Sequence, residues 1–214
     1  MKKIKGIIFD MDNTILQSRI DLESMKKETF GYLVSRGILP ADLDITNHTS
    51  SMIIAEATKT GLMTDQLIKE MWEIPKRFEA IGMKDADLEP GVPELLKELR
   101  DRFHMVVVTN NSVEAAEAAL KDHGILDYFD CVVGREMMKL MKPSPDGFLY
   151  VLKRYGNILA EEWISVGDSW IDGKASTEAG VRFIAYQGDV ELMNKMGVYP
   201  SAEITDIGEL KRFI

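Results

Sequence analysis

Cysteine is almost absent from this chain. Cys131 is the only one among 214 residues, so no disulfide can form within the chain. It starts the apolar run Cys-Val-Val, which predicts a buried and unreactive thiol. A chain without disulfides suits a reducing compartment, and we therefore expect the cytoplasm. Lys2, Lys3 and Lys5 precede only a four-residue apolar run before Asp10, so we expect no signal peptide.

Long apolar stretches and an excess of positive charge are also missing. No apolar run approaches the roughly 20 residues that a membrane helix needs, so we expect no membrane contact. With 26 Lys and Arg against 35 Asp and Glu, the net charge is −9 and no basic patch stands out. This argues against nucleic acid as a partner but is compatible with a small anionic substrate held by a local cation. The sequence does not distinguish a monomer from a homodimer.

The composition that is present, 45% apolar and 29% charged, is typical of a soluble globular protein. A chain of this length can form one large domain or a core domain with an insertion. Between residues 18 and 88 the apolar spacing predicts three helices, at 21–36, 47–60 and 64–81. Pro75 should kink the third helix or split it in two.

The rest of the chain alternates between strand and helix. We expect strands at 7–9, 105–108, 131–133, 163–166 and 183–186. A helix should open at 90–93 and turn Leu95, Leu96 and Leu99 inward, and further helices should follow at 112–123, 145–155, 171–179, 191–196 and 207–213. Such alternation predicts right-handed crossovers and a parallel sheet covered on both faces. We therefore predict an α/β fold: a Rossmann-like, doubly wound parallel sheet formed by residues 1–17 and 89–214, with residues 18–88 inserted as a smaller helical domain.

Two aspartates, Asp10 and Asp12, follow the first buried strand. Ligands of open α/β sheets gather at the carboxyl edge of the strands, where these residues should lie. Two carboxylates about 4 Å apart would repel by roughly 4 kcal/mol at an effective dielectric of 20. A cation, a shared proton or a basic side chain must offset that repulsion. Taken alone, the pair could also be a helix N-cap and a solvated turn residue.

Three further strand ends carry unusual residues. Thr109 starts the stretch Thr-Asn-Asn-Ser, in which a hydroxyl and backbone N–H groups lead into a helix, as in phosphate sites; ordinary capping by Ser112 is the alternative. Lys142 stands in a proline-stiffened turn that could hold it inward. Asp168 and Asp172 are four residues apart, so one helical turn can bring them to the same side.

These motifs, in this order, resemble the haloacid-dehalogenase (HAD) superfamily of phosphohydrolases. The matching stretches are DMDNT, VVVTN, KPSPDGF and GDSWIDGKAS, and the likeness of the core covers roughly residues 1–17 and 89–200. Four motifs in order are specific, whereas any one of them is weak. The insertion at 18–88 looks like the α-helical cap of the phosphoglycolate-phosphatase-like branch.

The resemblance implies a role for each motif residue. Asp10 would attack phosphorus and form an aspartyl-phosphate, and Asp12 would protonate the leaving alcohol and then activate water. Mg²⁺ would be held by the carboxylates of Asp10 and Asp168, the backbone carbonyl of Asp12, and Asp172 directly or through water. The transferring phosphoryl oxygens would be neutralised by Thr109, the N–H of Asn110 and Lys142.

The resemblance leaves the reaction and the substrate open. An acid at the position of Asp12 favours phosphate-ester chemistry over dehalogenation. We expect a phosphatase of a small phosphorylated metabolite, with phosphoglycolate as the leading candidate; the alternatives are a sugar-phosphate phosphomutase and a non-enzymatic, receiver-like phospho-acceptor. Arg19, close to the first strand, is the best candidate for a substrate contact from the cap, ahead of His48, Lys76 and Arg77.

Overall fold

The computed structural model describes residues 3–84 and 86–214, and the chain divides into two compact units. The core unit comprises Met1–Ser18 and Ala86–Ile214, and the helical unit comprises Arg19–Asp85. The short strands β2 (Leu16–Gln17) and β3 (Asp87–Leu88) pair antiparallel. They lie in the two segments that connect the units in sequence, and both belong to the core unit.

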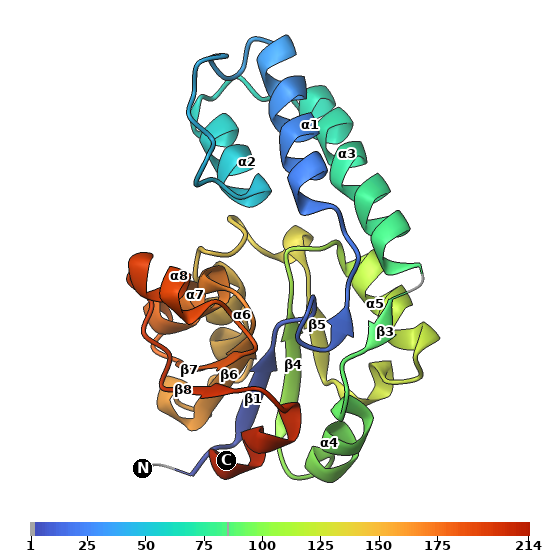
Figure 1. Cartoon of the computed structure of the whole chain (residues 1–214), viewed down its shortest axis with the longest axis vertical. Helices are drawn as coiled ribbons and strands as arrows, with labels where there is room; N and C mark the ends of the chain where they lie inside the picture. Colours follow the sequence, from blue (N-terminus) through green and yellow to red (C-terminus); the bar gives the residue numbers. More distant parts are fainter. Residues whose placement is uncertain (1–2, 85) are drawn as a thin grey trace. The chain divides into compact units, whose positions relative to one another are not determined.

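A six-stranded parallel sheet forms the centre of the core unit, in the order β5-β4-β1-β6-β7-β8 (Figure 1). Its strands are β1 (Gly6–Phe9), β4 (His104–Val108), β5 (Cys131–Val133), β6 (Trp163–Gly167), β7 (Arg182–Tyr186) and β8 (Ala202–Ile204). The predicted α/β fold with a doubly wound parallel sheet is confirmed. Strand β1 lies between β4 and β6, and its four residues are all buried, as a strand covered on both faces requires.

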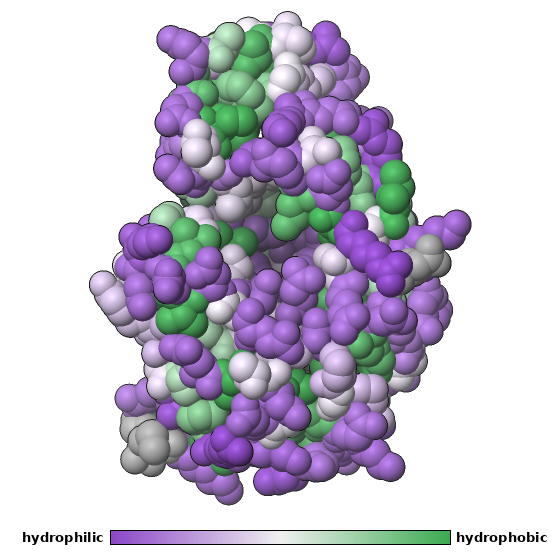
Figure 2. Space-filling view, in the orientation of Figure 1, coloured by the Kyte–Doolittle hydropathy of each residue, from purple (hydrophilic) through white to green (hydrophobic). Residues whose placement is uncertain are grey.

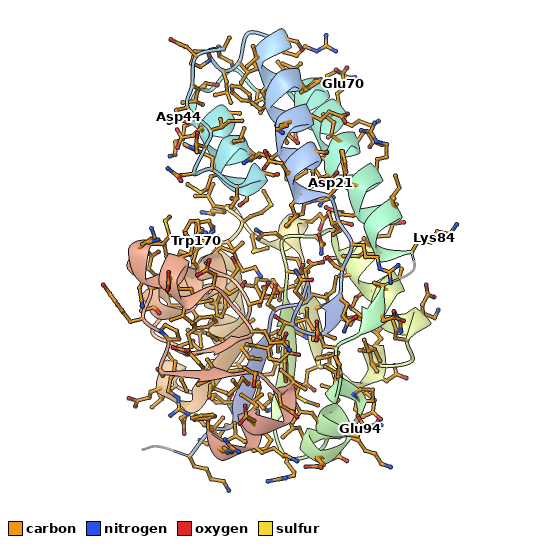
Figure 3. All side chains as sticks on the ribbon, in the orientation of Figure 1. Asp21, Asp44, Glu70, Lys84, Glu94 and Trp170 are labelled. Atoms are coloured by element: carbon orange, nitrogen blue, oxygen red, sulfur yellow. The ribbon has the colours of Figure 1, made fainter. Side chains whose placement is uncertain are left out.

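Helices connect these strands and cover both faces of the sheet. They are α4 (Val92–Leu99), α5 (Val113–Asp122), α6 (Asp146–Arg154), α7 (Trp170–Glu178, its first residue labelled in Figure 3) and α8 (Val190–Lys195). Right-handed crossovers put α4 and α5 on one face and α6, α7 and α8 on the other, because the chain moves along the sheet in opposite directions in the two halves. On the second face, Phe148 and Val151 of α6 and Ala175 of α7 pack against Ile8 and Val106.

The helical unit consists of α1 (Leu22–Ser35), α2 (Ser50–Lys59) and α3 (Asp65–Met83). Each begins at a residue whose side-chain oxygen accepts a backbone N–H: Asp21, labelled in Figure 3, then Thr49 and Thr64. Within this unit α1 packs against both α2 and α3.

Several expectations from sequence were wrong in detail. Helix α3 is not split at Pro75, which lies buried inside it; of the two predicted effects of this proline, a kink stays a prediction. The strands β2, β3 and β8 were not predicted, since two or three residues carry no readable period. The last predicted helix is a 3-10 helix, η4 (Ile207–Arg212). Cys131 is partly exposed rather than buried, although burial still raises the pKa of its thiol.

Among the described residues, no helix is both long and apolar enough to cross a membrane. On the face drawn in Figure 2, hydrophilic residues predominate and hydrophobic ones form small separate groups.

Candidate active site

The register of the sheet brings three strand ends together. Phe9 is level with Val107 of β4 on one side and with Val166 of β6 on the other. Asp10, the residue after β1, donates its backbone N–H to the carbonyl of Val166 at 2.9 Å. The residues that follow β4 and β6, Thr109 and Asp168, therefore start at the same edge of the sheet as Asp10.

Lys142 is the only lysine among the largest fully buried side chains of the described residues. Its Nζ donates to Asp10 Oδ1 at 2.5 Å, to Asp172 Oδ1 at 2.7 Å and to the carbonyl oxygen of Val108 at 2.9 Å. Burial alone would lower the pKa of Lys142, but the charges of Asp10 and Asp172 outweigh it and raise the pKa. The ammonium group therefore stays charged and ties the two acidic motifs together.

Asn110 holds the backbone of Lys142 through two reciprocal hydrogen bonds. Asn110 Nδ2 donates to the carbonyl oxygen of Lys142 at 3.0 Å, and the N–H of Lys142 donates to Asn110 Oδ1 at 2.8 Å. The sequence had suggested only the backbone N–H of Asn110. Its side chain has a second function, which is to fix the turn from which Lys142 reaches the edge of the sheet.

Three carboxylates form a compact acidic cluster. Asp10, Asp168 and Asp172 each offer an oxygen within 4.8 Å of the others. Burial, and after it the charge of Asp172, raises the pKa of Asp10 well above its usual range, against the opposing charge of Lys142. Burial and Asp172 raise the pKa of Asp168 to about 7. One ammonium cannot balance the charge of three carboxylates. A hard divalent cation, which prefers oxygen ligands, would supply the additional positive charge.

Both oxygens of Asp172 are already engaged. Oδ1 accepts from Lys142, and Oδ2 accepts the backbone N–H of Ser169 at 3.1 Å, in the first turn of α7. A methyl group at Gly167 would lie 2.7 Å from the Cβ of Asp172, so only glycine allows the strand to pass this closely.

Asp12 faces Asn111, a residue to which the sequence motifs assign no side-chain role. Asn111 Nδ2 donates to Asp12 Oδ2 at 2.6 Å. Burial raises the pKa of Asp12, whereas hydrogen bonds from Ser18 and Asn111 lower it. The second asparagine of Thr-Asn-Asn-Ser is the sequence signal for this contact, but the phosphate-site pattern predicts only backbone N–H donors from it.

Thr109 is completely buried, and its Oγ1 accepts the backbone N–H of Asn111 at 3.1 Å. Ser112 caps α5, accepting the N–H of Ala115 at 3.2 Å, so the capping interpretation of Ser112 is confirmed. Arg19 is the first residue of the helical unit, where its backbone N–H donates to the carbonyl of Gly82 at 3.0 Å. Contact between Arg19 and a substrate stays a prediction.

Comparison with known proteins gives concordant results. The family model of haloacid dehalogenase-like hydrolases matches residues 7–186. The phosphoglycolate phosphatase of Vibrio vulnificus (strain CMCP6) is 30% identical over 187 residues, which cover 84% of this chain and 82% of that protein.

Solved structures show the same fold. A provisionally named HAD hydrolase from Bacillus subtilis, bound to magnesium, aligns with a TM-score of 0.63 at 23% identity and covers 99% of both chains. A provisionally named β-phosphoglucomutase from Thermotoga maritima gives a TM-score of 0.62 at 23% identity, covering 99% of this chain and 100% of that one. At this level of identity the likeness concerns the fold alone.

Proposed function

The chain belongs to the haloacid dehalogenase-like hydrolase family, and we propose that it hydrolyses phosphate monoesters through an aspartyl-phosphate on Asp10. One observation supports this assignment above the others: the buried ammonium of Lys142 bridges Asp10 and Asp172 from two strand ends. A structural protein gains little from a buried ion cluster of this kind, because desolvation of the charges offsets their attraction. Family membership also argues against a receiver-like phospho-acceptor.

The chemistry starts at Asp10. A carboxylate oxygen of Asp10 forms a bond to phosphorus while the bond from phosphorus to the ester oxygen breaks. The electron pair of that bond leaves with the ester oxygen, which takes a proton from Asp12 and departs as the alcohol. Asp12, now ionised, accepts a proton from a water whose oxygen bonds to phosphorus while the bond from phosphorus to the Asp10 oxygen breaks. Inorganic phosphate leaves and the Asp10 carboxylate is restored.

The transferring phosphoryl group meets a prearranged set of donors. We assign this role to Lys142, the hydroxyl of Thr109 and the backbone N–H of Asn110. Lys142 is rigid because its Nζ already has three acceptors and Asn110 holds its backbone. Donors that need no rearrangement when charge develops are the main source of rate enhancement in phosphoryl transfer.

We propose Mg²⁺ as the cofactor, held by the carboxylates of Asp10 and Asp168 and the backbone carbonyl of Asp12. Asp172 would act through water, since both of its oxygens accept other hydrogen bonds. When bound, the ion supplies positive charge to the phosphoryl oxygens. The B. subtilis relative is bound to magnesium, which supports this choice.

The substrate proposal follows the sequence relatives. We propose a small phosphorylated metabolite, with phosphoglycolate first, because the V. vulnificus relative is a phosphoglycolate phosphatase. A phosphomutase activity is second, since that likeness rests on fold alone. We further propose that the helical unit serves as the cap and that Arg19 selects the substrate. Location in the cytoplasm and a monomeric or homodimeric state stay predictions.

A panel of phosphorylated metabolites, with phosphate release as the readout, tests the proposal. We expect many turnovers on at least one small phosphate monoester, loss of activity in EDTA and recovery with Mg²⁺. Labelling of Asp10 that stops after one phosphate, or activity unaffected by chelation, would contradict the hydrolase or the metal assignment respectively. Transfer of phosphate between positions of a sugar, without release, would favour the mutase.

A further inference from the structure

The two oxygens of Asp12 have different surroundings. Oδ2 accepts a hydrogen bond from Asn111 Nδ2 at 2.6 Å. Oδ1 is buried and has no hydrogen-bond partner among residues 3–84 and 86–214, so the Ser18 hydroxyl, which also lowers the pKa of Asp12, is not bonded to it. A buried carboxyl oxygen without a partner is costly, and a role in a reaction is one physical reason for a structure to keep such an atom.

The backbone around Asn111 is held independently of its side chain. Its N–H donates to Thr109 Oγ1 at 3.1 Å, and its carbonyl oxygen accepts the N–H of Arg135 at 3.0 Å. Ser112, the next residue, caps α5. A side chain at Gly134 would come within 2.9 Å of the Asn111 carbonyl oxygen, so the neighbouring loop also packs closely. Asn111 therefore presents its amide from a rigid support, and with 7% of its surface exposed it has little room to move.

An amide N–H can only donate. The oxygen that faces it must act as the acceptor, and in a neutral carboxyl group the oxygen without the proton is the stronger acceptor. The contact with Nδ2 thus favours a proton on Oδ1, which is the oxygen without a protein partner. We propose that Asn111 is a positioning residue for Asp12: it holds Oδ2 as the acceptor, so that Oδ1 carries the proton that is delivered to the leaving alcohol.

This inference rests on the proposed phosphatase reaction, and it deepens one step of it. The step is the cleavage in which the ester oxygen keeps the bonding electron pair and takes the Oδ1 proton. Help from the acid is needed most when the leaving alcohol is weakly acidic, as in an alkyl phosphate. It is needed least for 4-nitrophenyl phosphate, whose leaving phenolate is stable without a proton.

The test compares kcat/KM for two substrates, because this constant reports the steps up to alcohol release and not the later hydrolysis of the aspartyl-phosphate. The substrates are 4-nitrophenyl phosphate and the alkyl phosphate that the wild-type protein hydrolyses fastest. The variants are Asn111→Ala and Asn111→Leu, the second of which keeps the branched shape of the side chain without its hydrogen-bonding atoms. Asn157→Ala, at an exposed position, is the matched control.

We expect both Asn111 variants to lose about 100-fold in kcat/KM on the alkyl phosphate and less than about fivefold on 4-nitrophenyl phosphate. Inhibition by orthovanadate should be unchanged, since Lys142 and Thr109 are intact. Equal losses on the two substrates, or no loss on either, would overturn the positioning role. If the wild-type protein releases phosphate from neither substrate, the proposed function itself is wrong. If one variant does not fold, the other decides the question.

Discussion

The core unit and the helical unit place their charges in opposite ways. At the sheet edge, the side chains of Lys142 and Asp10 are only 2% and 8% exposed although they form an ion pair. In the helical unit, Arg77 and Glu28 also pair, but their side chains are 55% and 44% exposed. Exposed pairs of this kind contribute little to stability, and buried ones cost desolvation. Because buried charges do not add stability, the ion pairs at the sheet edge indicate a functional role, whereas the exposed pairs of the helical unit do not.

The largest effect should come from Asp10→Asn. This change keeps the shape of the side chain but removes the nucleophile, so phosphate release should fall by at least about 10⁴-fold. The fold should persist, since Lys142 keeps Asp172 and the Val108 carbonyl as acceptors. Steady-state phosphate release and circular dichroism measure the two outcomes.

Asp122→Asn, an exposed aspartate of α5, is the control and should behave as wild type. Full activity in Asp10→Asn would show that Asp10 is not the nucleophile.

Lys142→Ala should have the next largest effect. The phosphoryl group loses its buried cation, and kcat should fall by about 10²–10³-fold. Removing one partner of a buried ion pair also leaves the others uncompensated, so the free energy of unfolding should fall by about 3–5 kcal/mol. Kinetics and denaturant unfolding report these two losses separately.

The exposed Lys139, in the same loop, provides the matched substitution Lys139→Ala. If the two lysine variants were equally active, burial of charge would not mark the functional region.

Metal removal should change stability as well as activity. Burial and Asp172 raise the pKa of Asp168 to about 7 in the metal-free protein, so the folded state holds a proton that the unfolded state releases near its ordinary value. In EDTA, this contribution to stability is present at low pH and is lost as the pH rises through about 7. The melting temperature should therefore fall by a few degrees as the pH rises from the ordinary pKa of an aspartate to about 7.

Mg²⁺ should restore the melting temperature of the wild-type protein at pH 8, above the pKa of Asp168 of about 7. Asp168→Asn should show a smaller pH-dependent fall, since the pKa values of Asp10 and Asp12 are also raised, and an incomplete recovery, in thermal unfolding monitored with and without the ion. A melting temperature that does not respond to Mg²⁺ would count against a cation at the acidic cluster.

The smallest effect should come from Glu28→Gln, which breaks the exposed pair with Arg77 in the helical unit. We expect no change in kcat/KM and a melting temperature within the error of the measurement, with any difference disappearing in high salt. A large loss of stability would mean that the exposed and buried pairs differ less than their surroundings suggest.

Local patterns in the sequence were sufficient for most helices and strands of the core unit and for their order. Buried strands such as Gly6–Phe9 and Trp163–Gly167 are apolar runs, and helices such as Val113–Asp122 carry their own caps, so these signals are local. Because strands that alternate with helices form a parallel sheet, the fold class also followed. Local signals were insufficient for β8, which is short, and for α3, which is not split at Pro75.

Which atoms contact each other at the sheet edge, in contrast, depends on the tertiary structure. Lys142 reaches Asp10 across 132 residues of chain, and Asn111 reaches Asp12 across 99. Such pairs depend on strand register and on the direction in which each side chain leaves its turn, and neither is encoded in a local pattern. For that reason the sequence, through its family resemblance, could name residues such as Asp10, Asp12 and Lys142, whereas the amide that distinguishes the two oxygens of Asp12 became visible only in three dimensions.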